Sequence, residues 1–427
     1  MADYHVKALI IGAGVSGLSA ARILGRDALI LEKEAEPGGY CRSIRRNGFI
    51  WDWSGHFFHF RDEGQKQSFL NRFAPGELQL CKKDSRVLFK GALVHAPFQD
   101  NLHELPRADM LDCLADLLCS ENGHASYASF LDMLYARYGA ATTERFLRPY
   151  NEKLYACPLN TLDAGAMGRF FPGADRRQLA ANMRGAHSKS YNSRFYYPRH
   201  GAAAFIESLC RELPAGALRL SRSLCALDTN AHIALDSAGD RYHYERLINT
   251  AALPRFLSFL GEEERRFAAT LSWNKVLVFN LGFAQKALCR GAHWLYVPQR
   301  DAPFYRVGFY DNILGSDRAS LYVEIGFPSK TEPDVREALR NTLEALQKLG
   351  IIQPGNDLLD YEVILMDPAY VHLQPGTEEA VRRLRERLSS RGLYSIGRYG
   401  AWCYHSIEDC VREAEALAIS LKGGAQL

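Results

Sequence analysis

Long hydrophobic runs are missing from this sequence. None approaches the roughly 18 apolar residues that a membrane-spanning helix requires, and the first predicted strand starts within a few residues of Met1. That start leaves no room for the charged and apolar regions of a secretory signal peptide. We therefore expect a cytoplasmic protein without a membrane partner.

Cysteine pairs with a recognisable spacing are also missing. The 10 cysteines are scattered along the chain, with no C-x-x-C pair and no zinc spacing. This distribution is typical of reduced core thiols in a cytoplasmic protein, and it indicates no metal site.

Strong charge and low-complexity tracts are absent as well. The net charge of +3 is too small to indicate a nucleic-acid partner, so any preference for anions must come from local arginines. With 427 residues, 47% hydrophobic and 24% charged, the composition is that of an ordinary globular protein with two or three domains. The oligomeric state is not indicated.

The most specific pattern lies within the first 32 residues. An apolar strand runs into a glycine turn, then a helix, then a second strand that ends at Glu32. In this motif Gly12 makes the tight turn, Gly14 lets the backbone approach a pyrophosphate, and Gly17 lets the helix pack closely on the strand. The helix N-terminus attracts phosphate, and Glu32 can accept hydrogen bonds from an adenosine ribose. The order of these features predicts a bound dinucleotide.

A second glycine pair separates flavin from nicotinamide cofactors. Residues 36–43 read Glu-Pro-Gly-Gly-Tyr-Cys-Arg-Ser, directly after the acid. Adjacent glycines at 38 and 39 would let the backbone pass beside a second part of a bulky cofactor. This continuation resembles FAD proteins of the glutathione-reductase and amine-oxidase type, so we expect FAD.

Aromatic residues and histidines crowd residues 51–60. The His-x-x-His spacing of His56 and His59 could suggest a metal, but no further ligand follows at a suitable spacing. An aromatic core strand is the simpler alternative. We favour a loop along the flavin, with Gly55 giving backbone access and His56 near the reacting atoms.

Arginines beside aromatics or glycines are candidate anion ligands. Arg148, Arg169, Arg306 and Arg398 have such neighbours, and a guanidinium matches a diphosphate bidentately. For any one of them a structural salt bridge is the alternative.

Three further segments resemble UDP-galactopyranose mutases, especially the eukaryotic type. The first is residues 150–158. The second combines residues 294–296 with residues 303–306, and the third is residues 397–404. With the FAD start, the likeness extends along the whole chain. Generic amine oxidases lack the Pro-Phe-Tyr-Arg and Gly-Arg-Tyr-Gly combination.

The resemblance implies roles for individual residues. His56, Arg306 and Arg398 would be catalytic. The cofactor would contact Gly12, Gly14, Val15, Ser16, Gly17, Glu32, Lys33, Gly39, Tyr40, Ser43, Gly55, His56, Gly397, Arg398, Ser406 and Ile407. The nucleotide sugar would contact Asn151, Tyr155, Arg169, Asn192, Trp294, Tyr296, Arg306, Tyr370 and Tyr404.

It also implies a fold and a reaction. We expect an α/β protein whose discontinuous, Rossmann-like FAD-binding domain comprises residues 1–75, 190–255 and 385–427, with a mainly helical cap at 76–189 and an antiparallel-sheet substrate domain at 256–384. In the family reaction, reduced FAD forms an N5–sugar adduct, the sugar ring opens and recloses as pyranose or furanose, and no net redox change occurs. NADPH is a possible reductant.

The chain departs from the mutase pattern at the expected substrate site. Tyr155 stands where mutases usually have Trp, Cys403 where a basic residue is common, and residues 200–202 replace a glycine-richer turn. An oxidase or desaturase of the amine-oxidase or protoporphyrinogen-oxidase class therefore stays open as an alternative, as does a flavoprotein that only binds its ligand.

Overall fold

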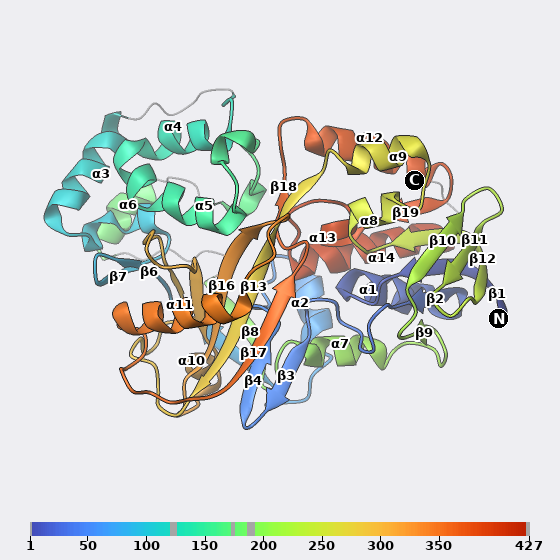
Figure 1. The fold of residues 1–427 in the computed structure, drawn as a ribbon, viewed down its shortest axis with the longest axis horizontal. Coiled ribbons are helices and arrows are strands. Elements are labelled where there is room, and N and C mark those ends of the chain that lie inside the picture. Colours follow the sequence, from blue (N-terminus) through green and yellow to red (C-terminus); the bar gives the residue numbers. More distant parts are fainter. Residues whose placement is uncertain (1, 120–125, 172–175, 186–192, 424–427) are drawn as a thin grey trace.

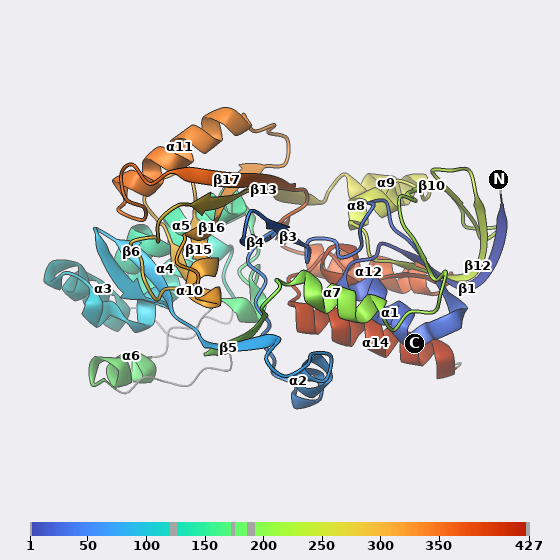
Figure 2. The ribbon, with the colours of Figure 1, turned by 90° about the horizontal axis from the view of Figure 1, so that it is seen from below.

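The computed structural model describes residues 2–119, 126–171, 176–185 and 193–423, and its chain forms two lobes (Figure 1). Both described chain ends lie in the same lobe, beside α1 (Val15–Leu24) and α14 (Ile407–Gly423). The other lobe carries a second sheet and the helices between residues 107 and 183 (Figures 1 and 2).

The first lobe is built on a sheet that has seven strands in the described residues. Its strands are β10 (Leu224–Asp228), β11 (Ile233–Asp236), β12 (Arg241–Asn249), β1 (Asp3–Ile11), β2 (Ala28–Leu31), β9 (Leu218–Arg219) and β19 (Leu393–Ser395). β1 is parallel to both β2 and β12, and β19 is parallel to β12. The chain thus returns to the sheet of β1 at β12, within the residues 190–255 expected to belong to the same domain.

Helices cover both faces of this sheet because its central strands are apolar on both sides. Ile10, Ile30 and Ile248 pack against α1, α14 and α7 (Ala203–Cys210). Leu9 and Leu247 face the opposite way, toward α8 (Leu253–Leu257) and α12 (Thr377–Ser389). Such continuously apolar strands are typical of parallel sheets buried on both faces.

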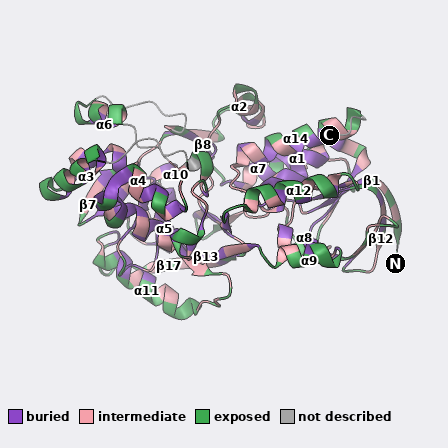
Figure 3. Cartoon of the chain, turned by 90° about the horizontal axis from the view of Figure 1, so that it is seen from above, coloured by how far each residue is buried: buried purple, intermediate pink, exposed green. Residues whose placement is uncertain are grey.

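The second lobe is built on a larger sheet, with eight strands in the described residues. Its strands are β17 (Leu358–Met366), β13 (Ser272–Phe283), β16 (Ser320–Pro328), β15 (Arg306–Phe309), β14 (Trp294–Tyr296), β6 (Ser85–Phe89), β7 (Ala92–His95) and β18 (Val371–His372). β13 and β16 pair antiparallel, in agreement with the antiparallel sheet expected within residues 256–384, whereas β14 and β6 pair in parallel. α11 (Val335–Lys348) covers one face of this sheet and exposes its outer side (Figures 2 and 3).

The helical cap follows in sequence but begins with strands. β5 (Leu78–Lys82), β6 and β7 occupy the start of the range predicted to be mainly helical, and β6 and β7 join the second sheet. Their alternating residues pack on a sheet supplied mostly by residues more than 190 positions later, which local periodicity does not reveal. The helices of the cap are α3 (Arg107–Cys119), α4 (Phe130–Thr142), α5 (Arg148–Tyr155) and α6 (Arg176–Met183).

Short elements complete the chain. Two small two-stranded antiparallel sheets connect the lobes. One pairs β3 (Ser43–Arg46) with β4 (Phe49–Asp52), and the other pairs β5 with β8 (Arg194–Pro198). The remaining helices are α2 (Glu63–Leu70), α9 (Glu262–Ala268), α10 (Tyr310–Leu314) and α13 (Gly397–Gly400). No described helix has the length and apolar character needed to cross a bilayer.

Candidate active site

A cavity of about 760 Å³ is lined by residues from both lobes. It collects segments that lie far apart in the sequence, from the glycine turn before α1 to the first residues of α14. Its walls include most residues predicted to bind the cofactor and part of the predicted substrate set. The predicted residues that line it are Gly12, Gly14, Val15, Ser16, Glu32, Lys33, Gly39, Tyr40, Gly55, His56, Arg306, Tyr370, Gly397, Arg398, Ser406 and Ile407.

The glycine turn has the geometry of a phosphate-binding site. Gly14 precedes the first residue of α1 and no side chain caps the helix, so its first N–H groups are available to an anion. A Cβ on Gly14 would meet nothing within 4 Å. By contrast, a Cβ on Gly17 would lie 2.0 Å from the carbonyl oxygen of Gly12, so Gly17 is required for packing and does not line the cavity.

Glu32 closes the same turn from the end of β2. Its carboxylate accepts hydrogen bonds from the backbone N–H of Ala13 at 2.7 Å and of Glu34 at 3.0 Å. The side chain therefore joins the glycine turn to the second strand at the cavity wall. An uncapped helix start, an open glycine and a fixed carboxylate fit a dinucleotide well.

Residues 53–57 form a loop along the cavity, as predicted. The alternative of an aromatic core applies on either side of this loop: Phe49 and Trp51 of β4 are buried and stacked, and Phe58 is buried against Phe69 and forms a β-bridge with Tyr196. Gly55 packs tightly on another side chain, because its Cβ would lie 2.5 Å from the hydroxyl of Tyr322.

His56 is neutral and held in one tautomer. Burial lowers the pKa of His56 to about 4. Its Nδ1 lies 2.7 Å from the carbonyl oxygen of Ser54, which can only accept, so Nδ1 carries the proton. Nε2 is consequently left with a lone pair, which can accept a hydrogen bond.

Arg306 already has a buried partner. Its guanidinium donates to both carboxylate oxygens of Glu324, at 2.7 and 2.8 Å, and the hydroxyl of Ser54 donates to Glu324 at 2.6 Å. Burial opposes both charges, yet the ion pair raises the pKa of Arg306 and lowers that of Glu324, so both are charged. The pairing was not predicted, since 18 residues separate the two in sequence and only the register of β15 and β16 brings them together.

Arg398 is the less compensated cation. Its guanidinium donates to the carbonyl oxygen of His405 at 2.9 Å and lies 4.3 Å from the ring of Tyr404. No carboxylate forms an ion pair with it among the residues that the structure describes. Arg398 therefore gives this part of the cavity a net positive charge.

The predicted substrate residues form an aromatic layer that joins the cavity at Tyr370. Tyr404 stacks on Tyr370 with ring centroids 5.7 Å apart, and Tyr155 meets the same ring edge-on at 6.2 Å. Tyr370 lines the cavity, whereas Tyr155 and Tyr404 lie one ring behind it.

A second part of this layer lies on the side of β14. Trp294 stacks on Phe57 at 5.0 Å, and Tyr296 contacts Tyr150, which contacts Tyr305. Phe57 and Tyr305 line the cavity, but Trp294 and Tyr296 do not.

Several buried polar atoms in this layer lack hydrogen-bond partners within the described part of the chain. They include Oδ1 of Asn151 and the hydroxyls of Tyr155 and Tyr322. Burial raises the pKa of both tyrosines, so each is a neutral hydroxyl that can donate. Buried polar atoms are usually satisfied, so these three give the wall behind the cavity unused hydrogen-bonding capacity.

Two predicted contacts, those of Ser43 and Arg148, are made differently. Ser43 does not line the cavity; it donates to Asp52 at 2.6 Å and accepts from the N–H of Ala203. Arg148 pairs with Glu144 and Glu152 away from the cavity. In both cases a nearby carboxylate takes the donors, which sequence spacing alone does not show.

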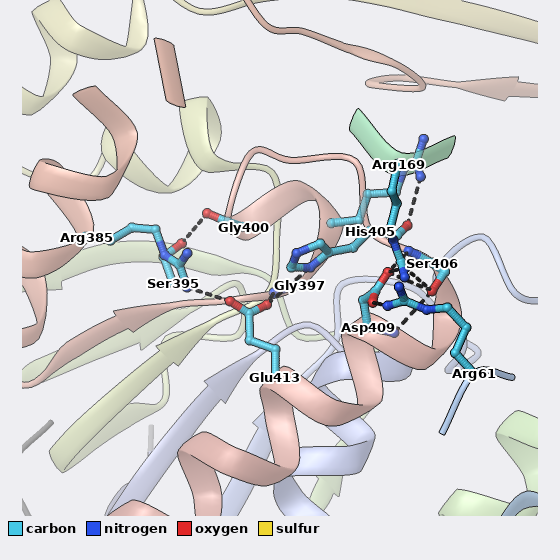
Figure 4. Close-up of polar contacts among 11 residues, drawn as sticks. Arg61, Arg169, Arg385, Ser395, Gly397, Gly400, His405, Ser406, Asp409 and Glu413 are labelled. Atoms are coloured by element: carbon cyan, nitrogen blue, oxygen red, sulfur yellow. Dashed lines mark hydrogen bonds and ion pairs between the residues drawn. The ribbon is translucent and has the colours of Figure 1, made fainter. Parts of the chain in front are cut away.

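Arg169 lies on the outside of the start of α14. It pairs with Asp409 and donates to Ser406 at 3.3 Å, while Arg61 lies 3.6 Å from the same Asp409 (Figure 4). Ser406 accepts from the N–H of Asp409 and so caps the start of α14. Asn192 lies outside the described residues. No group of three or more metal-binding side chains occurs in the described chain.

Comparisons with known proteins agree with this architecture. Residues 10–73 match the NAD(P)-binding Rossmann-like domain family. The structure resembles that of reduced UDP-galactopyranose mutase with a TM-score of 0.92 and 23% identity, covering 99% of this chain and 96% of the other. Putrescine oxidase is also similar, with a TM-score of 0.68 and 14% identity over 99% of this chain and all of the other.

Sequence similarity to curated proteins is confined to short segments. Human all-trans-retinol 13,14-reductase is 35% identical over 74 residues, which are 16% of this chain and 12% of that protein. Mitochondrial protoporphyrinogen oxidase of Nicotiana tabacum is 45% identical over 56 residues, or 12% of this chain and 11% of that protein. The chain therefore matches only a small part of these relatives, and it has the Rossmann-like fold shared by UDP-galactopyranose mutase and the amine oxidases.

Proposed function

We propose that this protein is a flavin-dependent mutase that interconverts the pyranose and furanose forms of a nucleotide sugar, as in UDP-galactopyranose mutase. The observation that carries the proposal is that two half-buried arginines, Arg306 and Arg398, line the same cavity as the dinucleotide-binding turn. An oxidase of apolar or amine substrates has no need for two guanidinium groups beside its cofactor, whereas a diphosphate does.

The cofactor of this proposal is FAD, with NADPH as a possible reductant. Gly14 and the start of α1 would hold its pyrophosphate, and Glu32 its ribose. When bound and reduced, FAD supplies an electron-rich centre that can act as a nucleophile toward the sugar. His56, neutral and with a free Nε2 lone pair, would accept a hydrogen bond in the same cavity.

The arginines and tyrosines would retain the diphosphate while it is detached from the sugar. Arg398 provides the net positive charge, and Arg306 adds the N–H groups that Glu324 does not occupy. The hydroxyl of Tyr370, in the cavity wall, would donate to the same anion, with Tyr155 and Tyr404 packed one ring behind it. Donors fixed before the reaction keep the leaving group in position for its return without a large entropic cost.

The main rival is an oxidase or desaturase, since the short sequence matches are to a retinol reductase and a protoporphyrinogen oxidase. Those matches span only 74 and 56 residues, or 16% and 12% of this chain, so they do not discriminate between the two activities. A protein that binds nucleotide sugars without converting them is a further possibility. In each case the location proposed is cytoplasmic.

Two experiments separate these functions, one under anaerobic conditions with reduced flavin and one in air with oxidised flavin. The purified protein is reconstituted with FAD, reduced with dithionite, and incubated with UDP-galactopyranose and UDP-galactofuranose, and the products are separated by chromatography. Interconversion without consumption of reductant would support the mutase. Substrate-dependent bleaching of oxidised flavin, with peroxide formed in air, would establish the oxidase instead, and tight binding without conversion would indicate a binding protein.

A further inference from the structure

A charged triad lies in the cavity wall beyond the residues used above. Glu413, on α14, accepts from Arg385 at 2.6 Å through Oε1 (Figure 4). Its Oε2 accepts from the N–H of Gly397 at 2.7 Å and lies 3.5 Å from Nδ1 of His405. His405 and Gly397 line the cavity, whereas Arg385 and Glu413 support them from behind.

The triad carries one net positive charge. Arg385 neutralises the negative charge of Glu413. The positive charge of a protonated His405 is therefore not cancelled by Glu413. The other groups that face His405 are the thiols of Cys403 and Cys410, together with Arg398, which binds its carbonyl oxygen. Burial acts to lower the pKa of His405, but its interactions with Cys403, Cys410 and Glu413 outweigh burial and raise that pKa.

Glu413 also ties this charge to the cofactor-binding turn. Gly397 has a φ of +80°, and a Cβ there would lie 2.4 Å from the hydroxyl of Ser16 in the first turn of α1. The segment from Gly397 to His405 therefore runs along the cavity from the start of α1 past Arg398. Its position is fixed by Glu413 and not by the ligand.

We propose that the His405–Glu413–Arg385 triad stabilises the reduced, anionic form of the bound flavin relative to the oxidised form. Two electrons and one proton convert neutral oxidised flavin to an anion, so a fixed cation in the wall of a buried site favours the product. The inference rests on the proposed flavin, but not on the sugar chemistry. It explains how the chain would keep its cofactor in the reduced state that the proposed reaction requires.

The flavin midpoint potential tests the triad directly. It is measured anaerobically with a reference dye in the FAD-loaded wild type and in His405→Gln. In His405→Gln we expect the affinity for reduced flavin to fall about tenfold relative to the affinity for oxidised flavin, which lowers the midpoint potential by about 30 mV. Arg385→Gln leaves Glu413 to cancel His405 and should shift the potential in the same direction; because Arg385 is partly exposed, this variant should fold even if His405→Gln does not.

His59→Gln is the matched control. His59 is a half-buried imidazole whose Nδ1 lies 3.0 Å from the carbonyl oxygen of Arg194, and it does not line the cavity. Its substitution should leave the potential unchanged. An unchanged midpoint potential in both triad variants would overturn the proposal. An equal loss of affinity for oxidised and reduced FAD would also overturn it, because the triad charge would then act on the phosphates of FAD and not on its flavin ring. A protein that takes up no flavin would instead refute the proposed function.

Discussion

At the residue scale, Arg306 shows how a buried partner changes the meaning of a motif. Its sequence context indicates a phosphate ligand, and its position in the cavity agrees. Glu324 nevertheless takes two of its N–H groups and neutralises its charge. Arg306 can therefore orient a diphosphate, while most of the attraction for the anion comes from Arg398.

Arg306→Ala should reduce both ligand affinity and stability. Loss of the donors should weaken binding of UDP by about 2 kcal/mol, measured by titration calorimetry. The variant also leaves Glu324 buried without a cation, which should lower the free energy of unfolding by about 3–5 kcal/mol.

The double variant Arg306→Ala with Glu324→Gln separates the two effects. It removes the unpaired charge, so the free energy of unfolding should recover while the affinity for UDP stays low. Wild-type affinity in either variant would contradict the role of Arg306.

At the scale of elements, the start of α1 is specified by two glycines with different tasks. Gly17 allows the helix to approach the carbonyl oxygen of Gly12, and Gly14 leaves the cavity wall open beside the helix N-terminus. One glycine serves the fold and the other serves the ligand.

Gly17→Ala should therefore destabilise the protein, whereas Gly14→Ala should not. The methyl group at 17 would meet backbone that cannot move away, at a cost of about 1–3 kcal/mol or more. At 14 the methyl group meets nothing, so the unfolding free energy should change by less than about 0.5 kcal/mol. Flavin retained after desalting should nevertheless fall in Gly14→Ala, because the methyl group occupies the cavity wall. Thermal unfolding and flavin absorbance check both outcomes, and equal flavin retention in Gly14→Ala and the wild type would contradict them.

At the scale of the whole molecule, Asp52 joins the two lobes. Its buried carboxylate accepts from Ser43, from the N–H of Ala202 before α7, and from the hydroxyl of Tyr197. Its carbonyl oxygen accepts from Asn280 on the second sheet. The cavity loop begins at the next residue, so this junction fixes the loop relative to both lobes.

Asp52 should make stability depend on pH near neutrality. Burial raises the pKa of Asp52 to about 7, although its hydrogen bonds act to lower it. The folded protein thus holds a proton that the unfolded chain releases near pH 4, and the stability this provides is lost as the pH rises through 7.

Asp52→Asn should remove that dependence. The amide can keep Oδ1 for Ser43 and Ala202 and donate to the hydroxyl of Tyr197. Between pH 5 and pH 8 its free energy of unfolding should gain roughly 2 kcal/mol relative to wild type, as measured by urea unfolding. Asp317→Asn, whose side chain is 99% exposed, is the control and should show no such gain. A constant difference between Asp52→Asn and wild type would contradict the assignment.

The sequence by itself determined the dinucleotide-binding half of the molecule. Gly12, Gly14, Gly17 and Glu32 act through backbone geometry within one strand–turn–helix–strand unit, so their spacing along the chain sets their positions in space. The strands at 246–251 and 393–396 and the helix from 407 were also predictable, because apolar patterns identify buried strands and Ser406 marks a helix start.

Only the tertiary structure decided which charges in the cavity are free. The Arg306–Glu324 pair depends on the register of two strands, and the Arg169–Asp409 pair depends on the docking of the cap against α14. The pairing of β6 with the second sheet depends on residues more than 190 positions away. Electrostatic compensation depends on distances of a few ångströms between residues remote in sequence. For that reason the motifs could name the arginines but could not show that Arg398, and not Arg306, keeps its charge uncompensated.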